Sequence, residues 1–134
     1  CVDTASSSGY RRGLPNSIET KTMAEAVRAL MLSWLLSHNY AGYQAEAIIR
    51  NAWIESRLQP CIVARSGSSY LFQYVGSRKR KLQQMSGGGC PSVEAQLAFL
   101  DRELHSAAYS RFLTAPPHLA FAVFRRCYEH GRRC

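Results

Sequence analysis

The sequence predicts a mainly helical (α+β) domain with one small β-hairpin inserted after the second helix. Three observations carry this prediction: two amphipathic stretches near the N-terminus, a short β-like region in the middle, and capped helical segments after it. With 134 residues, 46% of them apolar, the chain can build one core and leaves little room for a second domain. We expect residues 1–16 to form a polar arm and residues 17–134 to form a single domain.

The first two predicted helices carry most of the expected core. Thr22 and Glu25 have the spacing of a capping box, so the first helix should begin at Thr22. Residues 39–42 interrupt the helical pattern, and a second helix should run roughly from Tyr43 to Ser56. Its buried side is expected to hold five residues: Ala45, Ile48, Ile49, Ala52 and Trp53.

The segment from Cys61 to Val75 contains two short β-like runs around a Ser-Gly-Ser-Ser turn, which predicts a small hairpin. A basic helix should follow over about residues 77–85. Ser92 has the position of an N-cap for the next helix. The last helix should open at residues 114–117 and end at Gly131, with four residues near the core: Leu119, Phe121, Val123 and Phe124.

The formal charge of +8 predicts an anionic partner or surface, such as nucleic acid, a membrane or a cell wall. Nucleic acid is not expected, because the aromatic residues lie mostly at core spacing and do not interleave with the basic ones. The longest apolar run, Leu119 to Phe124, is far shorter than a membrane span. The histidines lack metal-ligand spacing, so neither a metal nor a cofactor is expected.

Five cysteines in so short a chain favour disulfides and an exported protein, in the periplasm, the cell envelope or the medium. The start of the chain, Cys1 followed by small polar residues, resembles a mature bacterial lipoprotein with a lipidated cysteine. The other four cysteines would then form two bridges by one of three pairings: Cys61, Cys90, Cys127 and Cys134. Alternatively, Cys1 is bridged and another cysteine is free. Lipidation of Cys1 is the only membrane attachment we expect.

One acidic residue has the position of a candidate general acid. At helical spacing, Glu55 lies beside Ile48 and Ala52 at the edge of the buried stripe, in the last turn of its helix. Partial burial and the negative end of the helix dipole would both disfavour the ionised carboxylate. A general acid must hold its proton near neutral pH. Position alone also fits an ordinary surface glutamate, so the surrounding residues decide.

The segment from Asn51 to Pro60 resembles the helix end that carries the catalytic glutamate in lysozyme-like peptidoglycan hydrolases, most of all the phage tail-lysin branch. Leu71 to Arg78 is similar to the Gly-Leu-Phe-Gln-Trp-x-Gly-x-Arg segment of that branch. Residues 91–97 and 128–129 match its later helices in order and spacing, so the resemblance covers residues 43–130. It implies a lysozyme-like fold, a substrate cleft beside the hairpin, cleavage of glycan strands, and a bacterial or phage-derived source.

The resemblance also implies roles for residues of the site. Glu55 would be the general acid, and Gln73, Tyr74 and Tyr70 would contact glycan from the hairpin. Tyr74 replaces the family's Trp and keeps a flat ring, whereas the bulkier Tyr70 replaces a Gly. Arg78 would support the hairpin or contact substrate. The resemblance places Glu129, together with Glu94, at positions that look structural.

No Asp or Glu occurs between Glu55 and Glu94, although lysozymes that hydrolyse with two carboxylates usually hold an aspartate on the hairpin. Glu55 could act alone, as in lytic transglycosylases, while the 6-hydroxyl of the sugar attacks. Alternatively, Ser68 or Ser69 positions a water for hydrolysis. In a third reading the site is inactive and only binds glycan. We expect a monomeric muramidase or lytic transglycosylase whose partner is peptidoglycan in an anionic cell wall.

Overall fold

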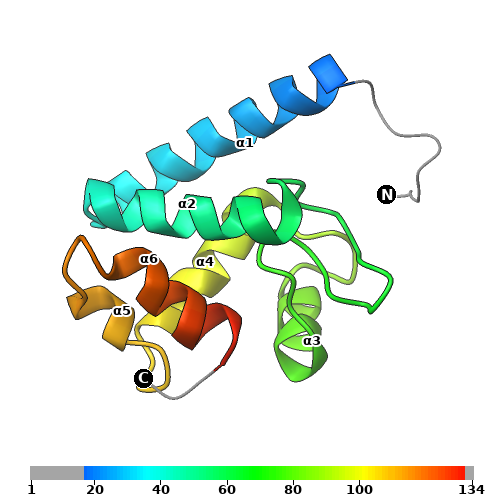
Figure 1. Ribbon diagram of the computed structural model, residues 1–134. Coiled ribbons are helices and arrows are strands. Elements are labelled where there is room, and N and C mark those ends of the chain that lie inside the picture. Colours follow the sequence, from blue (N-terminus) through cyan, green and yellow to red (C-terminus); the bar gives the residue numbers. More distant parts are fainter. Residues whose placement is uncertain (1–16, 132–134) are drawn as a thin grey trace.

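The computed structural model describes residues 17–131 and is built mainly of helices (Figure 1). Its longer helices are α1 (Ser17–Ser37), α2 (Gly42–Ser56), α3 (Gly76–Met85) and α4 (Val93–Leu104). Three short segments follow: α5 (Arg111–Thr114), α6 (Ala120–Val123) and the π-helix η1 (Phe124–Glu129). The mainly helical prediction is confirmed. Within residues 17–131, no helix is both long enough and apolar enough to cross a bilayer.

The predicted bounds of the middle helices are close to those observed, whereas the start of α1 is not. Ser92 caps α4 as predicted, because its side chain accepts a hydrogen bond from the Ala95 amide at 3.0 Å. Helix α1 begins at Ser17, so Thr22 lies inside the helix and does not cap it. The reason is local: neither Gly nor Pro occurs within α1, so nothing interrupts the helix between Ser17 and Thr22.

Two apolar residues predicted for the core lie on the surface instead. Trp53 is 45% exposed because its side chain lies off the stripe formed by the buried residues of α2. Leu119 is also 45% exposed, because it precedes the first turn of α6. The single last helix that the sequence predicts is divided here into separate segments. Phe124, by contrast, is fully buried as predicted.

The predicted β-hairpin is not confirmed. Residues 57–75 form a compact loop with only two isolated antiparallel bridges, Val63 with Ser69 and Ser69 with Tyr74. Its backbone hydrogen bonds close short turns, for example from the Ala64 amide to the Ser68 carbonyl at 2.8 Å. Tyr70 has a φ of 77° and Gln73 a φ of 55°, and such left-handed residues interrupt an extended strand.

The core lies where α2 meets the rest of the chain. Helix α1 packs on α2 and α4, while α6 and η1 pack on α2 (Figure 1). Helix α3 packs on α4, and the loop of residues 57–75 joins α2 to α3. The largest fully buried side chains come from every one of these segments except α6: Met31, Leu35, Ile48, Ile49, Leu71, Phe72, Leu82, Leu97, Leu100, Phe112, Phe124 and Tyr128.

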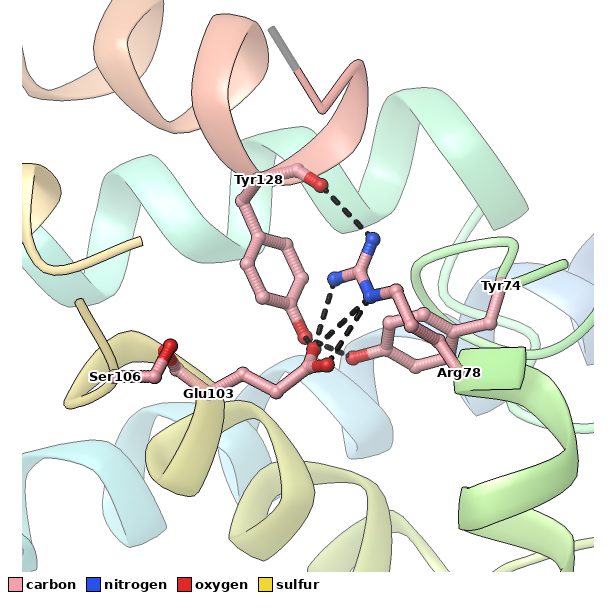
Figure 2. A network of polar contacts seen from close by, with 5 residues as sticks. All are labelled: Tyr74, Arg78, Glu103, Ser106 and Tyr128. Atoms are coloured by element: carbon pink, nitrogen blue, oxygen red, sulfur yellow. Dashed lines mark hydrogen bonds and ion pairs between the residues drawn. The ribbon is translucent and has the colours of Figure 1, made fainter. Parts of the chain in front are cut away.

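A partly buried ion pair joins α3 to α4 and η1. The guanidinium of Arg78 donates to both carboxylate oxygens of Glu103, the shortest contact being 2.8 Å, and to the Tyr128 carbonyl at 3.3 Å (Figure 2). The Tyr128 hydroxyl donates to Glu103 at 2.7 Å, and the Tyr74 hydroxyl makes a short hydrogen bond to that of Tyr128. The backbone carbonyl of Glu103 also accepts from Ser106. Each charge in this cluster has a partner, as burial requires.

Aromatic rings surround the same guanidinium. Its carbon lies 4.5 Å from the ring centre of Tyr128 and 4.9 Å from those of Tyr74 and Tyr109. Burial disfavours the charge of Arg78, but the hydrogen bonds to Glu103 and the electrostatic interactions with Tyr128, Glu103 and Tyr74 together outweigh this and raise the pKa of Arg78. Burial likewise raises the pKa of Tyr74 and Tyr128, so both hydroxyls stay neutral.

Replacing Glu103 by Gln should therefore destabilise the domain strongly, because it leaves the Arg78 charge without its carboxylate. The two side chains are only 24% and 15% exposed, and breaking such a pair costs about 3 kcal/mol. The matched control is Glu46→Gln, which breaks a pair with Arg28 that is 43% and 46% exposed, so it should cost less than about 1 kcal/mol. Thermal unfolding measures both, and equal losses would contradict the assigned role of Arg78.

One disulfide closes the segment between α2 and α4, which contains α3. Cys61 bonds to Cys90, 29 residues further along the chain, which realises one of the predicted pairings. Cys127 is also in a disulfide. The predicted arm of residues 1–16, with Cys1, and the predicted bridge partner Cys134 lie outside the described residues.

Replacing both Cys61 and Cys90 by Ser should lower the unfolding free energy by about 3–4 kcal/mol, because the unfolded chain regains the freedom of a loop of this length. Chemical denaturation under oxidising conditions measures the loss. An unchanged midpoint would mean that the bond does not constrain the unfolded chain.

Candidate active site

Glu55 lies one residue before the end of α2, where the chain turns sharply into the loop of residues 57–75. The turn is made by two successive left-handed residues, Arg57 with a φ of 54° and Leu58 with a φ of 59°. Such a backbone is unfavourable for residues other than glycine, and clusters of this kind are frequent at functional sites. The side chain of Glu55 is 21% exposed. It is therefore close enough to solvent to meet a ligand.

The carboxylate of Glu55 is held by a cation from η1. The Arg125 guanidinium donates to Glu55 Oε2 at 2.7 Å and to Asn51 Oδ1 at 3.0 Å. Asn51 is fully buried, and its side-chain amide donates to the Ala47 carbonyl at 2.8 Å. Residues 51 and 55 lie one turn apart on α2, so Arg125 bridges them from the facing helix. Sequence reasoning proposed Glu55 as a site residue but did not propose Arg125.

A second carboxyl lies near this pair. Glu129 ends η1, and its Oε2 atom is buried without a hydrogen-bond partner among residues 17–131. Burial raises the pKa of Glu129 well above its ordinary range, and the negative charge of Glu55 raises it further. The positive charges of Arg125 and Arg78 lower this pKa without reversing the shift. Burial and the nearby charge of Glu55 thus favour the protonated form of Glu129, whereas Glu55 forms an ion pair with Arg125.

The structure places two predicted glycan contacts in the core. Tyr74 is 2% exposed and Tyr70 is 5% exposed. The Tyr70 hydroxyl accepts a hydrogen bond from Gln83 at 2.9 Å, and Tyr74 belongs to the cluster around Arg78. A sugar cannot stack on a buried ring, so both tyrosines support the loop from the core side. Arg78 binds Glu103 and lies against the ring of Tyr74, which fits the first of its two expected roles, support of the loop.

The remaining loop residues differ in access. Ser69 is fully buried, and its hydroxyl donates to the Gly67 carbonyl at 2.9 Å, so it is not placed to hold a water in an open site. Ser68 is half-buried and hydrogen-bonds to the side chain of Ser66. Gln73 is also half-buried, but its amide donates to the Tyr70 carbonyl at 3.0 Å. Of the predicted loop contacts, Ser68 and Gln73 keep some exposure.

Two surface cavities, of about 1040 and 690 Å³, are lined by neither Glu55 nor the loop of residues 57–75. The larger lies against α5, and the smaller lies between α3 and α4. Glu55 is therefore not a candidate because of a cavity. It is a candidate because its carboxylate is partly exposed, pairs with Arg125 and lies near Glu129, whose Oε2 atom is buried.

A family model described as phage tail lysozyme matches residues 26–133, which is most of the chain. The chain belongs to this family. It is therefore a lysozyme-like peptidoglycan hydrolase, as the resemblance implied. No curated protein and no solved structure matches it. Phage tail lysozymes act on the cell wall, which places the action of the family in the extracellular or periplasmic space.

Neutral Glu129 makes the stability of the protein depend on pH. The folded protein keeps this proton above pH 4.5, the ordinary pKa, whereas the unfolded chain releases it. Stability therefore falls as pH rises between the unfolded and folded pKa values, by at most about 1.4 kcal/mol per pH unit. Glu129→Gln should remove this loss, so the difference in melting temperature between the variant and the wild type should widen from pH 4.5 upward. Parallel curves would show that Glu129 is ionised in the folded protein.

Proposed function

We propose that this phage tail lysozyme cleaves the glycan strands of peptidoglycan with Glu55 as its general acid. The observation that carries the proposal is the setting of Glu55: a partly exposed carboxylate at the end of α2, paired with Arg125 at 2.7 Å. The sequence around it resembles the helix end that carries the catalytic glutamate in lysozyme-like enzymes. Membership of the family supports peptidoglycan as the substrate.

In the first step, protonated Glu55 gives its proton to the glycosidic oxygen as the bond from that oxygen to the sugar carbon breaks. The carboxylate that this leaves on Glu55 is stabilised by Arg125, whose guanidinium already lies at hydrogen-bond distance. Asn51 keeps the guanidinium in place through its own contact at 3.0 Å. The ion pair in the structure thus corresponds to the ionised form of Glu55, which proton donation regenerates.

The second step distinguishes two enzyme classes. In a lytic transglycosylase, the Glu55 carboxylate takes a proton from the 6-hydroxyl of the muramyl sugar, whose oxygen bonds to the sugar carbon and leaves an anhydro end. In a hydrolase, a water gives the proton and the oxygen, and a reducing end results. Residues 57–75 carry no Asp or Glu, so the usual second carboxylate of the loop is absent from that segment. We favour a single catalytic glutamate, with half-buried Ser68 as a water-positioning group if the product is hydrated.

One observation favours a second candidate, a lysozyme-like module that binds glycan without cleaving it. The pairing of Glu55 with Arg125 stabilises the ionised carboxylate, which cannot donate a proton. If nothing reverses that pairing when glycan binds, the protein would bind the wall and leave it intact.

The test is digestion of purified peptidoglycan by the oxidised protein, with the products identified by mass spectrometry. Glu55→Gln keeps the size of the side chain but cannot donate its proton, so product release should fall about 10²–10⁴-fold. Glu94→Gln is the matched control, because Glu94 is exposed in the first turn of α4, and it should retain the wild-type rate.

Anhydro ends that depend on Glu55 would identify a transglycosylase, and reducing ends that depend on it would identify a hydrolase. Equal product release by the wild type and Glu55→Gln would contradict the assignment of Glu55. Wall binding without products from either protein would establish the silent module instead.

A further inference from the structure

Glu55 must gain a proton before it can act as a general acid. In the structure Glu55 is paired with Arg125, which stabilises a carboxylate. A general acid must start the reaction protonated. A proton therefore has to reach Glu55, and the Arg125 cation has to leave it.

Glu129 lies near this pair, and its surroundings favour the protonated carboxyl. Its Oε2 atom is buried and, within the part of the chain that the structure describes, has no hydrogen-bond partner. Burying an ionised carboxylate without a partner is costly, so the group stays neutral. A buried polar atom without a partner calls for an explanation, and storage of a proton supplies one.

The charged groups around Glu129 come from three elements. Glu55 on α2 raises its pKa, whereas Arg125 on η1 and Arg78 on α3 lower it. Arg78 is occupied, because both carboxylate oxygens of Glu103 on α4 accept its hydrogen bonds. The hydroxyl of Tyr74, which burial keeps neutral, also interacts with Glu129. Arg125 is therefore the cation that Glu55 and Glu129 have in common.

The local winding of the chain lets Arg125 serve either carboxyl. Arg125 and Glu129 lie four residues apart within η1, and the His130 amide donates to the Arg125 carbonyl at 3.1 Å, five residues back. Such π-helical turns are rare and frequently occur at functional sites. Arg125 reaches across to α2 from the same turn that carries Glu129.

We propose that Glu129 is a positioning residue that stores the proton for Glu55: the two carboxyls share one proton and compete for the guanidinium of Arg125. This rests on the proposed function of Glu55. In the resting form Glu55 is ionised on Arg125 and Glu129 carries the proton. In the acid-competent form the O–H bond of Glu129 breaks, one forms on Glu55, and Arg125 turns to the new carboxylate of Glu129. The summed charge of the three groups is zero in both forms.

Binding of substrate favours the transfer of the proton from Glu129 to Glu55. A glycan strand that covers Glu55 removes water from its carboxylate and so disfavours the ionised form. The Oε2 atom of Glu129 is already buried, and once Arg125 pairs with this carboxyl, the cost of its ionisation falls. Binding of glycan thus converts the resting arrangement into the one that can donate a proton.

The direct test follows the side-chain carboxyl carbons of Glu55 and Glu129 by NMR in the full-length, ¹³C-labelled protein without substrate, as pH is varied. In Glu55→Gln the titration midpoint of Glu129 should move down, because a like charge is lost and Arg125 is released to pair with it. In Glu94→Gln, the matched control, the midpoint of Glu129 should stay unchanged. A Glu129 midpoint that is the same in the wild type and Glu55→Gln overturns the proposal. This comparison of the wild type with Glu55→Gln can be made even if Glu129→Gln does not fold.

Cleavage of peptidoglycan gives a second readout. Glu129→Gln cannot pass on a proton, so its activity should drop most near neutral pH and recover as pH falls, because solvent then protonates Glu55 directly. A profile identical to that of the wild type, with Glu55→Gln inactive, would overturn the role of Glu129 and leave the proposed function intact. If Glu55→Gln remains active, the proposed function fails, whereas the shared proton is still decided by NMR.

Discussion

The ion pair of Arg78 with Glu103 is the interaction on which the rest of the structure depends. Its guanidinium joins α3 to α4 and also binds the Tyr128 carbonyl at 3.3 Å, directly before Glu129. Tyr128 donates back to Glu103 at 2.7 Å, so the end of η1 is fixed from two sides (Figure 2). Because η1 also packs on α2, this anchor determines where Arg125 and Glu129 lie relative to Glu55.

Two clusters of charge thus involve η1, and they differ in how completely they are paired. In the first, each charge has a partner: both carboxylate oxygens of Glu103 are bound, and the Arg78 cation lies among aromatic rings. Such a cluster rigidifies the fold. In the second, Arg125 serves Glu55 while Glu129 keeps a buried oxygen without a partner in residues 17–131. An arrangement with one cation for two carboxyls has two forms of equal charge, as an acid that must gain and lose a proton requires.

Much of the fold follows from local signals in the sequence, whereas the long-range contacts do not. The spacing of apolar residues predicts α2, and the Ser92 cap predicts the start of α4. The loop after α2 differs from the predicted hairpin, because left-handed residues such as Tyr70 replace strand pairing with tight turns. The family has Gly where this chain has Tyr70, and its φ of 77° is a backbone that favours glycine. Glu55 is a candidate because of its place at a helix end and the family resemblance of the residues around it. Its partner Arg125 lies 70 residues away, and no local pattern encodes such a contact.

The measurement that tests the account most directly is a crystal structure of Glu55→Gln with a peptidoglycan tetrasaccharide. The account predicts that a glycosidic oxygen lies within hydrogen-bond distance of the amide of residue 55, and that Arg125 has turned toward Glu129. A glycan bound elsewhere, for example in the cavity between α3 and α4, would contradict the claim that Glu55 is the acid of this phage tail lysozyme.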